Sequence, residues 1–254
     1  MSTFADMTSD HVFQSRTEGC GAVIRHLRET DSTNQDARAW ALDGAPDGAV
    51  VIADHQRAGR GRFKRTWVSA PGQNLLLTLV IRRTLPRPAL LPLAIGVGVC
   101  NTVRSFLPWS SAGLKWPNDV RIDGRKVAGI LVESPGPGVY LAGIGLNVNQ
   151  VDFPEDLATE PTSLMLETAD RLRRADVFDR LMDALDDALD MLERGDLLPA
   201  YRSLLEGRGA EVQLEDGRRG VMKDVDASGG LVLETGTGVI VVHSGDVSLR
   251  PPPA

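Results

Sequence analysis

The sequence predicts an α+β protein, with a larger domain of strands and helices followed by a small β-barrel domain. The length of 254 residues is enough for one large and one small domain. Up to about residue 206, β-rich segments are interspersed with segments of helical periodicity, whereas the rest consists of short β segments separated by Gly-containing turns. We therefore expect a flexible N-terminal arm at residues 1–21, a larger domain at 22–206 and a C-terminal domain at 207–254.

The first half of the larger domain is expected to contain three strands and two helices. The strands are predicted at 22–28, 49–53 and 74–81, and the helices at 35–42 and 89–106. The segment Asp31-Ser32-Thr33-Asn34 precedes the first helix and supplies residue types that cap helix N-termini. The second helix is apolar enough to be buried, but its longest apolar run is only about half the length that spans a bilayer, so we expect no membrane span.

The second half of the larger domain is expected to contain three strands and a long amphipathic helix. Asp123-Gly124 is a strong hairpin signal between strands at 119–122 and 126–133, and a Pro/Gly turn precedes a strand at 140–148. Apolar residues then recur at helical spacing, at Val177, Leu181, Leu185, Ala188 and Leu192. Residues 211–249 have the pattern of short strands in a small β-barrel.

The charge distribution indicates one local anion site in an acidic protein. The net charge of −6 argues against a general nucleic-acid binder. Between His55 and Asn118, however, there is no Asp or Glu, although ten basic residues lie there. The two cysteines and four histidines show no metal-binding spacing, and the N-terminus lacks the layout of a signal peptide, so a cytoplasmic location is expected.

The basic segment from Gln56 to Trp67 has the composition of an anion-binding loop. Gly59 and Gly61 allow close backbone approach, and the interleaved arginines can bind phosphate. The segment is not a dinucleotide fingerprint, because Lys64 stands at the third glycine position, and the chain has no P-loop motif. The alternative is a solvated basic loop, or one that touches RNA.

Three further elements are candidates for ligand binding, each with a structural alternative. Lys126 begins an otherwise apolar strand shortly after Lys115-Trp116-Pro117-Asn118-Asp119, where its charge either meets an anion or faces solvent. The two glycines of Gly143-Ile144-Gly145-Leu146-Asn147 indicate either close ligand approach or tight strand packing. Ser32, Thr33 and Asn34 either cap a helix or offer hydroxyl and N–H groups to a polar ligand.

The order and spacing of these elements resemble the catalytic core of the biotin–protein ligases. The resemblance covers most of residues 22–250, and the combination of Gly59-Arg60-Gly61-Arg62 with the Lys115–Asp119 element is its most specific part. It implies a core similar to class II aminoacyl-tRNA synthetases, with a mixed sheet flanked by helices, and an SH3-like C-terminal domain. It also implies ATP-dependent activation of biotin to biotinyl-5′-AMP, followed by transfer to a lysine of a biotin carboxyl carrier protein.

The resemblance assigns roles to individual residues of this chain. The implied biotin ligands are Ser32, Thr33, Gln56, Gly59, Arg60, Lys126, Gly129 and Gly143. The implied nucleotide ligands are Arg62, Arg65, Trp67, Asn118 and Asn147, and the implied catalytic residues are Lys126, Arg62 and Asp119. Gly129 and Gly143 would leave room for the biotin ring, and Lys126 would contact the reacting carboxylate and α-phosphate. Mg²⁺ would accompany ATP, with its ligands left open.

Two departures and two alternatives accompany the resemblance. Phe63-Lys64 stands where many relatives have a small or glycine-containing pair. About 20 residues precede the first core strand, too few for the DNA-binding domain of some relatives, so we expect no sequence-specific DNA binding. The alternative functions are a lipoate–protein ligase and a non-catalytic module that binds biotin, a nucleotide or RNA. A homodimer formed through the sheet is possible for this family and is left open.

Overall fold

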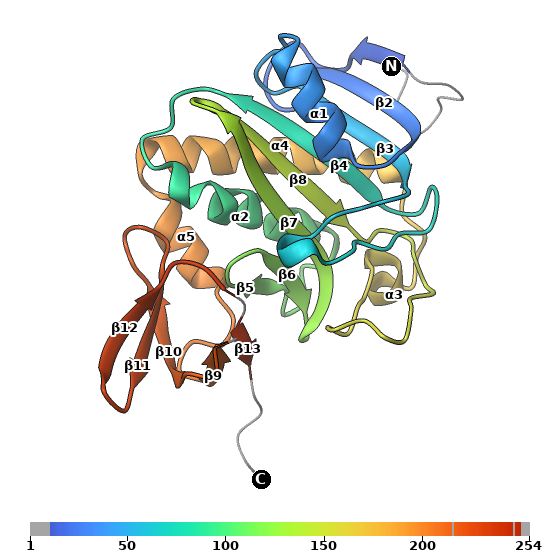
Figure 1. The fold of residues 1–254 in the computed structure, drawn as a ribbon. Coiled ribbons are helices and arrows are strands. Elements are labelled where there is room, and N and C mark those ends of the chain that lie inside the picture. The colour runs from blue at the N-terminus through green and yellow to red at the C-terminus, as the bar shows by residue number, and fades with distance from the viewer. Residues whose placement is uncertain (1–10, 215, 246, 250–254) are drawn as a thin grey trace.

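The computed structural model describes residues 11–214, 216–245 and 247–249, and its main feature is a mixed sheet of eight strands (Figure 1). The order across the sheet is β1-β2-β3-β4-β8-β7-β6-β5. Neighbouring strands β2 and β3 are parallel and all other neighbours are antiparallel. The strands are β1 (His11–Gln14), β2 (Val23–Thr30), β3 (Val50–Gln56), β4 (Leu75–Arg82), β5 (Gly113–Lys115), β6 (Asp119–Ile122), β7 (Arg125–Gly136) and β8 (Val139–Leu146).

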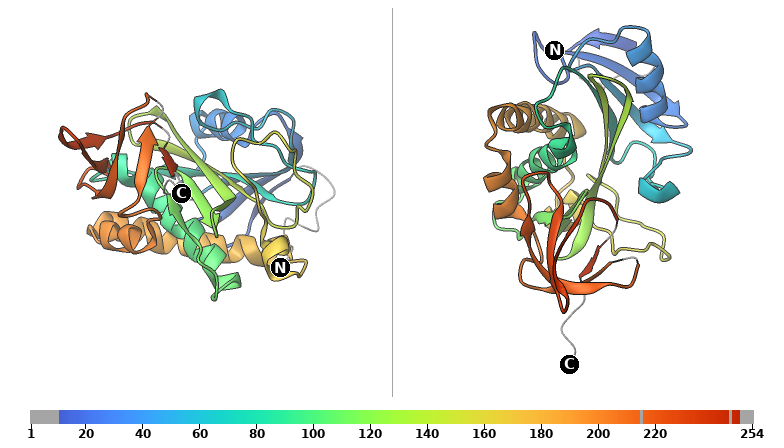
Figure 2. Two further views of the ribbon diagram at one scale, coloured as in Figure 1. Left: turned by 90° about the horizontal axis from the view of Figure 1, so that it is seen from below. Right: turned by 60° about the vertical axis from the view of Figure 1, so that its left-hand side comes forward.

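Helices cover both faces of this sheet, as Figure 2 shows from the side. One face carries α2 (Leu91–Phe106) and α4 (Arg174–Arg194), with α5 (Leu197–Leu204) beside them, and the other carries α1 (Thr33–Leu42). The alternation of β3 divides its side chains between two hydrophobic clusters: Val50 and Ile52 join the α2–α4 side, and Val51 joins the α1 side. The predicted mixture of buried strands and helices is therefore confirmed.

Helix α2, which follows a short 3-10 turn (Pro88–Leu90), is the buried core helix that its composition predicts. By length and composition alone, the helical segment Pro88–Phe106 is long and apolar enough to cross a membrane. However, 67% of its apolar 18-residue stretch is buried inside the protein. Its partners are α4 and the sheet. The predicted hairpin at Asp123-Gly124 is also confirmed, since both residues have positive φ, 48° and 82°.

The C-terminal segment forms a separate five-stranded antiparallel sheet that shares the main core. The strands, in the order β12-β11-β10-β9-β13, are β9 (Glu211–Leu214), β10 (Arg219–Val225), β11 (Leu231–Thr235), β12 (Gly238–Val242) and β13 (Val247–Leu249). Buried residues of this sheet, such as Met222 and Leu231, belong to the same cluster as α2 and α4. The two parts of the chain are thus packed together without a gap between their cores.

The prediction of a flexible arm over residues 1–21 is wrong for residues 11–21, while residues 1–10 lie outside the described part of the chain. Residues 11–14 form β1, which pairs with β2 at the sheet edge. Arg16 lies 2.5 Å from Asp183 of α4, and the Cys20 N–H donates to Asp186 of the same helix. These partners are far away in sequence, so no local pattern indicates them. Strand β5 and the short helices α3 (Leu164–Thr168) and α5 were also not predicted, because they have too few residues to show a period.

A partly buried ion-pair network ties β2, β3 and α4 together and should make stability depend on pH. The Asp54 carboxylate lies 3.0 Å from His26 Nε2 and 2.8 Å from Arg174. Burial raises the pKa of Asp54, but the hydrogen bonds from His26 and Arg174 outweigh burial and leave the pKa below its ordinary value.

Because the pKa is lower in the folded state, Asp54 should stabilise the fold fully above the unfolded pKa of about 4, and this contribution should be lost as the pH falls through the folded pKa. Urea unfolding across this range should show Asp54→Asn less stable than the parent near neutral pH, with the difference shrinking in acid. The control is Asp176→Asn, at an exposed α4 residue whose contact with Arg173 is 3.5 Å. A difference for Asp54→Asn that does not change with pH would contradict the prediction.

Candidate active site

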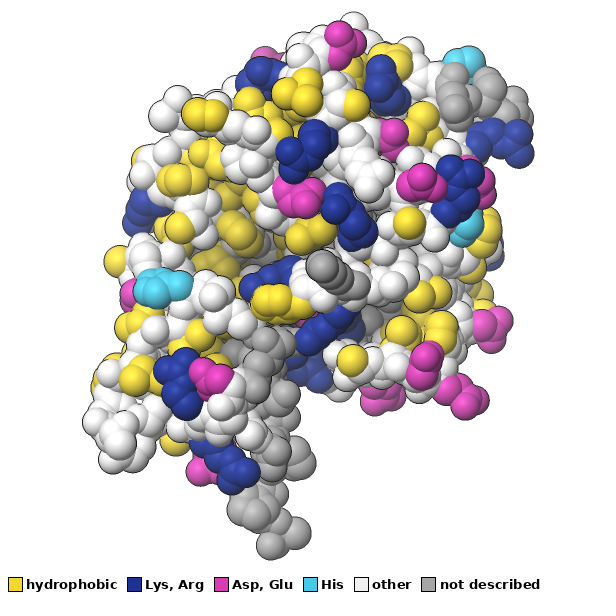
Figure 3. Space-filling view, viewed as in Figure 1, with side chains coloured by type: hydrophobic (Ala, Val, Ile, Leu, Met, Phe, Trp, Pro, Cys, Tyr) yellow, Lys and Arg dark blue, Asp and Glu magenta, His cyan; other side chains and the backbone are white. Residues whose placement is uncertain are grey.

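One pocket brings together every predicted site residue except Gly59. It lies among the ends of β3, β7 and β8, the start of α1, the loop 57–66 and the segment 153–161. The predicted residues that line it are Ser32, Thr33, Gln56, Arg60, Arg62, Arg65, Trp67, Asn118, Asp119, Lys126, Gly129, Gly143 and Asn147. Several Lys and Arg side chains gather around the hollowed middle of this face (Figure 3).

A buried polar network forms one end of the pocket at the start of α1. Gln56 Oε1 accepts hydrogen bonds from the Thr33 N–H (2.8 Å) and the Thr33 hydroxyl (3.1 Å). The Thr78 hydroxyl donates to Asn34 Oδ1 at 2.6 Å and lies 2.9 Å from Thr33 Oγ1. Ser32 occupies the N-cap position, but its side chain makes no capping hydrogen bond. The capping interpretation therefore does not account for the Ser32 hydroxyl, and Gln56 satisfies the first helical N–H instead.

Glu133 of β7, which the sequence did not single out, links this polar end to the basic loop. Its Oε2 atom accepts a hydrogen bond from Asn34 Nδ2 at 2.9 Å and lies 3.4 Å from an Arg60 guanidinium nitrogen. Asn34 is thus oriented from two sides, by Thr78 and Glu133. An acidic residue ending an apolar strand was the only sequence signal for Glu133.

The pocket glycines lie closely against protein side chains, while their predicted role of leaving room for a ligand ring stays a prediction. A Cβ atom added at Gly143 would lie 2.3 Å from Asn34 Oδ1. At Gly145 it would lie 2.4 Å from the Trp67 indole, and at Gly129 it would lie 2.9 Å from the same ring. Trp67 therefore packs directly on the backbone of β7 and β8. Gly145, for which the sequence left ligand approach and strand packing open, has the tighter contact with the Trp67 ring.

Gly59 is the one predicted site residue that does not line the pocket, and its predicted ligand contact stays a prediction. It is buried, the Trp67 N–H donates to its carbonyl at 2.9 Å, and an added Cβ atom would lie 2.6 Å from the Trp67 carbonyl oxygen. Its small size lets the two sides of the loop pass closely. This role explains the glycine through backbone packing.

Lys126 and the turn before β6 form the charged end of the pocket. Lys126 Nζ lies 2.7 Å from Asp119 Oδ1 and 5.6 Å from the centre of the Trp67 ring. Asn118 Oδ1 accepts a hydrogen bond from Arg62, while Asn118 Nδ2 donates to the Ile130 carbonyl. Lys126 therefore faces the pocket, and the alternative of a solvent-facing strand residue is wrong.

The segment 153–161 supplies a largely apolar wall that the sequence did not predict. Phe153, Leu157, Ala158 and Pro161 line the pocket. This segment is held in place through the Lys126 backbone: its N–H donates to the Glu160 carbonyl at 2.7 Å, and its carbonyl accepts from the Thr162 N–H at 2.9 Å. The segment has neither helical nor strand periodicity, which is why sequence patterns did not reveal it.

Two buried uncharged polar atoms of the pocket have no hydrogen-bond partner within the described chain. They are Asn147 Oδ1 and Trp67 Nε1. The Asn147 amide is fixed in orientation, because its Nδ2 donates to the Thr162 carbonyl at 2.9 Å. Unpaired buried polar groups are unfavourable, so this acceptor and this donor mark positions where a bound ligand would supply partners.

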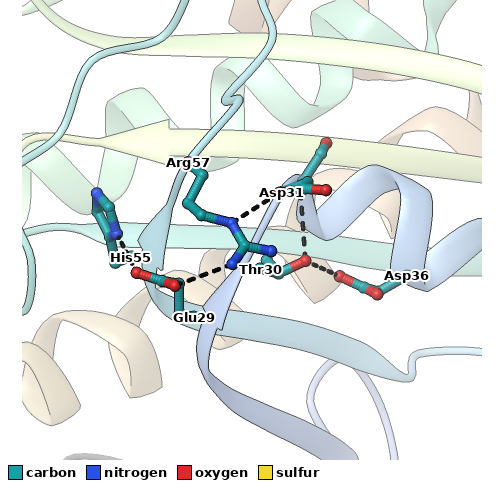
Figure 4. Close-up of polar contacts among 7 residues, drawn as sticks. Glu29, Thr30, Asp31, Asp36, His55 and Arg57 are labelled. Atoms are coloured by element: carbon teal, nitrogen blue, oxygen red, sulfur yellow. Dashed lines mark hydrogen bonds and ion pairs between the residues drawn. The ribbon is translucent and has the colours of Figure 1, made fainter.

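Not every basic residue of the acid-free segment belongs to the anion site. Arg57, at the start of the loop, donates to Asp31 at 2.8 Å and to Glu29 at 3.1 Å, and His55 Nδ1 lies 3.0 Å from Glu29 (Figure 4). This cluster raises the pKa of Arg57 through its hydrogen bond and charge interaction with Asp31. Arg57 therefore anchors the beginning of the loop to the end of β2.

Trp116 joins the turn before β6 to the C-terminal sheet. Its ring N–H donates to the Gly229 carbonyl at 2.9 Å, and the side chain is buried. Trp116→Phe should lower the free energy of unfolding by about 1–3 kcal/mol, because the smaller ring loses this bond and leaves the part-buried Gly229 carbonyl without its partner. The measurement is urea unfolding, and Trp109→Phe is the matched control, since Trp109 is 75% exposed. Equal effects of the two substitutions would contradict the assigned contact.

Comparisons with known proteins agree with this geometry. The model of the biotin/lipoate A/B protein ligase family matches residues 27–149, and that of the biotin protein ligase C-terminal domain matches residues 209–250. The biotin–[acetyl-CoA-carboxylase] ligase of Mycobacterium tuberculosis is 38% identical over 90% of this chain and 91% of its own length. The bifunctional ligase/repressor BirA of Escherichia coli is 31% identical over 91% of this chain and 75% of its own length.

Solved structures show the same relationship. A biotin protein ligase from Aquifex aeolicus in complex with biotin and ATP superposes with a TM-score of 0.80 and 28% identity. The match covers 89% of this chain and 98% of the Aquifex chain.

Proposed function

The chain belongs to the biotin–protein ligase family. On that basis we propose which part of the pocket binds biotin and which part binds ATP. The enzyme uses ATP to activate biotin as biotinyl-5′-AMP and then transfers biotin to a lysine of a biotin carboxyl carrier protein. This proposal rests on one observation: the pocket has an uncharged polar end at α1 and a cationic end at Lys126 and Arg62. A neutral head group and a reacting anion would be bound at these opposite ends.

We propose that the uncharged end holds the biotin head group. Thr33, Gln56 and Asn34 form a preorganised set of hydrogen-bonding groups there, and the Ser32 hydroxyl is not used as a cap. Arg60, which belongs to the basic loop and lies 3.4 Å from Glu133, would contact the biotin carboxylate, away from the head group. Gly143 contributes by letting Asn34 lie close to β8, which sets the depth of this end.

The cationic end is proposed to bind ATP. Arg62 and Arg65 would hold the phosphates, and Asn118 would orient Arg62. Trp67 and Asn147 would lie against the adenine. Asn147 Oδ1, the buried acceptor without a partner in the described chain, is suited to accept a hydrogen bond from an amino group of the base.

The chemistry of the first step requires cations where these residues lie. The biotin carboxylate oxygen attacks the α-phosphorus, which forms a new O–P bond and breaks the bond between the α-phosphorus and the pyrophosphate oxygen. Two anionic groups must therefore approach each other. Lys126 is proposed to neutralise this charge, exchanging Asp119 for the substrate as its partner. In the second step the carrier lysine amine attacks the biotinyl carbonyl and AMP leaves.

We propose that Mg²⁺ enters with ATP. Asp119 is the acidic side chain among the described pocket residues, and Mg²⁺ commonly binds one or two carboxylates together with substrate phosphates, so the site fits a nucleotide-borne ion. When bound, the ion would offset the charge of the leaving pyrophosphate. No group of three acidic, His or Cys ligands occurs in the part of the chain that the structure describes, which agrees with an ion held largely by the nucleotide.

The finer features of the fold and its surroundings also remain proposals. We propose a class II aminoacyl-tRNA-synthetase-like core at 22–206 and an SH3-like domain at 207–254, supported by the mixed and antiparallel sheets in these ranges. A cytoplasmic location and the absence of sequence-specific DNA binding stay predictions from the sequence, and a homodimer stays an open alternative.

The test is incubation of the purified chain with α-labelled ATP and biotin. We expect labelled biotinyl-AMP, and its loss with transfer of biotin when a carrier domain is added. Adenylate formation with lipoate in place of biotin would favour a lipoate–protein ligase. Binding of biotin or ATP without an adenylate would favour a non-catalytic module, and either result would overturn the proposed function.

A further inference from the structure

Phe63 lies at the tip of the basic loop in a conformation that its side chain does not favour. Its φ and ψ of 53° and 36° place it in the left-handed region, which disfavours bulky L-residues and favours glycine or asparagine. The side chain is also 55% exposed, so burial offers little compensation. Three non-glycine residues of the described chain have positive φ, and Phe63 is the aromatic one among them.

The ring of Phe63 contacts the cations of the loop. The Arg62 guanidinium lies 4.9 Å from the ring centre and the Arg65 guanidinium lies 6.0 Å from it. Both distances are within the range of cation–π attraction. Arg62, Phe63 and Arg65 all line the pocket. A shared aromatic surface offsets the mutual repulsion of two guanidinium groups and narrows the range of positions that each can take.

We propose that Phe63 is a positioning residue that holds Arg62 and Arg65 ready for the phosphates of ATP. This inference rests on the proposed function, because it takes these two arginines as phosphate ligands. Phe63 restricts the positions of Arg62 and Arg65 before ATP binds, whereas without it these side chains would become ordered only on binding. Phe63 therefore contributes to the affinity for ATP. The biotin head group is proposed to bind at the other end of the pocket, where Thr33 and Gln56 lie.

The experiment compares four substitutions at Phe63 in single-turnover adenylate formation, with ATP and biotin varied separately. Phe63→Leu keeps an apolar side chain and the backbone strain but removes the ring, and Phe63→Gly removes both ring and strain. We expect each to raise the KM for ATP about tenfold, as loss of two exposed cation–π contacts implies. Phe63→Tyr and Phe63→Trp keep a ring and should stay within about twofold of the parent, while biotin affinity changes little in all four.

These variants separate positioning from the other roles that Phe63 could have. If only the backbone conformation matters, Phe63→Leu will behave like the parent, and the inference is overturned. If the ring instead contacts the nucleotide directly, Phe63→Leu will raise the KM by the same factor in an Arg65→Ala background, which also overturns it. We expect a smaller factor in that background, because one of the two positioned cations is then absent.

Failure of this inference is distinct from failure of the proposed function. The proposed function fails if the unaltered enzyme forms no biotinyl-AMP. The inference on Phe63 fails if the unaltered enzyme is active, Arg62→Ala and Arg65→Ala each raise the KM for ATP, and Phe63→Leu does not.

Discussion

Replacement of Lys126 by alanine should lower the rate of biotinyl-AMP formation by about two to three orders of magnitude, the loss that follows removal of one preorganised charge-stabilising group. The ammonium lies at the cationic end of the pocket, where negative charge increases as the carboxylate meets the α-phosphate. A cation placed there stabilises the transition state more than the bound substrates. Biotin affinity should change much less, because Thr33 and Gln56 lie at the opposite end. The measurement is single-turnover adenylation with a parallel biotin titration.

Because of the ion pair with Asp119, Lys126→Ala should also lower the free energy of unfolding. From the sequence, a lysine at a strand end contributes little to folding, but its removal leaves the largely buried Asp119 carboxylate without this cation. The double variant Lys126→Ala/Asp119→Asn removes that unpaired charge and is used to measure stability alone, because Asp119 itself belongs to the proposed catalytic residues. Lys126→Arg should not restore the rate fully, because a planar guanidinium places its donors differently.

The matched control for this prediction is Lys223→Ala. Lys223 is also a strand lysine paired with an acidic residue, Glu234, but it lies in the C-terminal sheet and does not line the pocket. Adenylation should be nearly normal in this control. Near-normal adenylation in a stable Lys126→Ala protein would instead remove Lys126 from the proposed mechanism.

Gly145→Ala should destabilise the fold by about 1–3 kcal/mol, the usual effect of inserting a methyl group into a tightly packed site. The new Cβ atom would lie 2.4–2.7 Å from three atoms of the Trp67 indole, so the ring must move away from the strand. Because Trp67 lines the pocket, ATP affinity should fall as well, while biotin affinity should be better preserved. Urea unfolding and separate ATP and biotin titrations measure these effects.

Gly136→Ala provides the same substitution in open space. Gly136 also lies in the β7–β8 hairpin, but nothing lies within 4 Å of its added Cβ atom. In a Trp67→Ala background, Gly145→Ala should destabilise the fold much less than in the parent, because the clashing ring is absent. Equal effects of Gly145→Ala in both backgrounds would show that the indole is not the reason for this glycine.

Local sequence patterns determined the elements of this protein and the neighbourhood of its site. Alternation predicted β2, apolar periodicity predicted α4, and Asp123-Gly124 predicted a hairpin, because each depends on residues close together in the chain. The basic loop and the Lys115–Asp119 element carried enough chemistry to indicate an anion site and a resemblance to a ligase family. The pocket then contained almost every residue so predicted.

Tertiary structure alone decided which side chains meet in the pocket. Glu133 meets Asn34 across 99 positions of sequence, and Trp67 packs on Gly145 from 78 positions away, so neither contact leaves a local pattern. The same reason explains β1, which is stabilised by its partner strand, and the segment 153–161, which is held through the backbone of Lys126. Residue type and spacing thus determined which groups are available for catalysis, whereas close packing between distant segments determined how they are oriented.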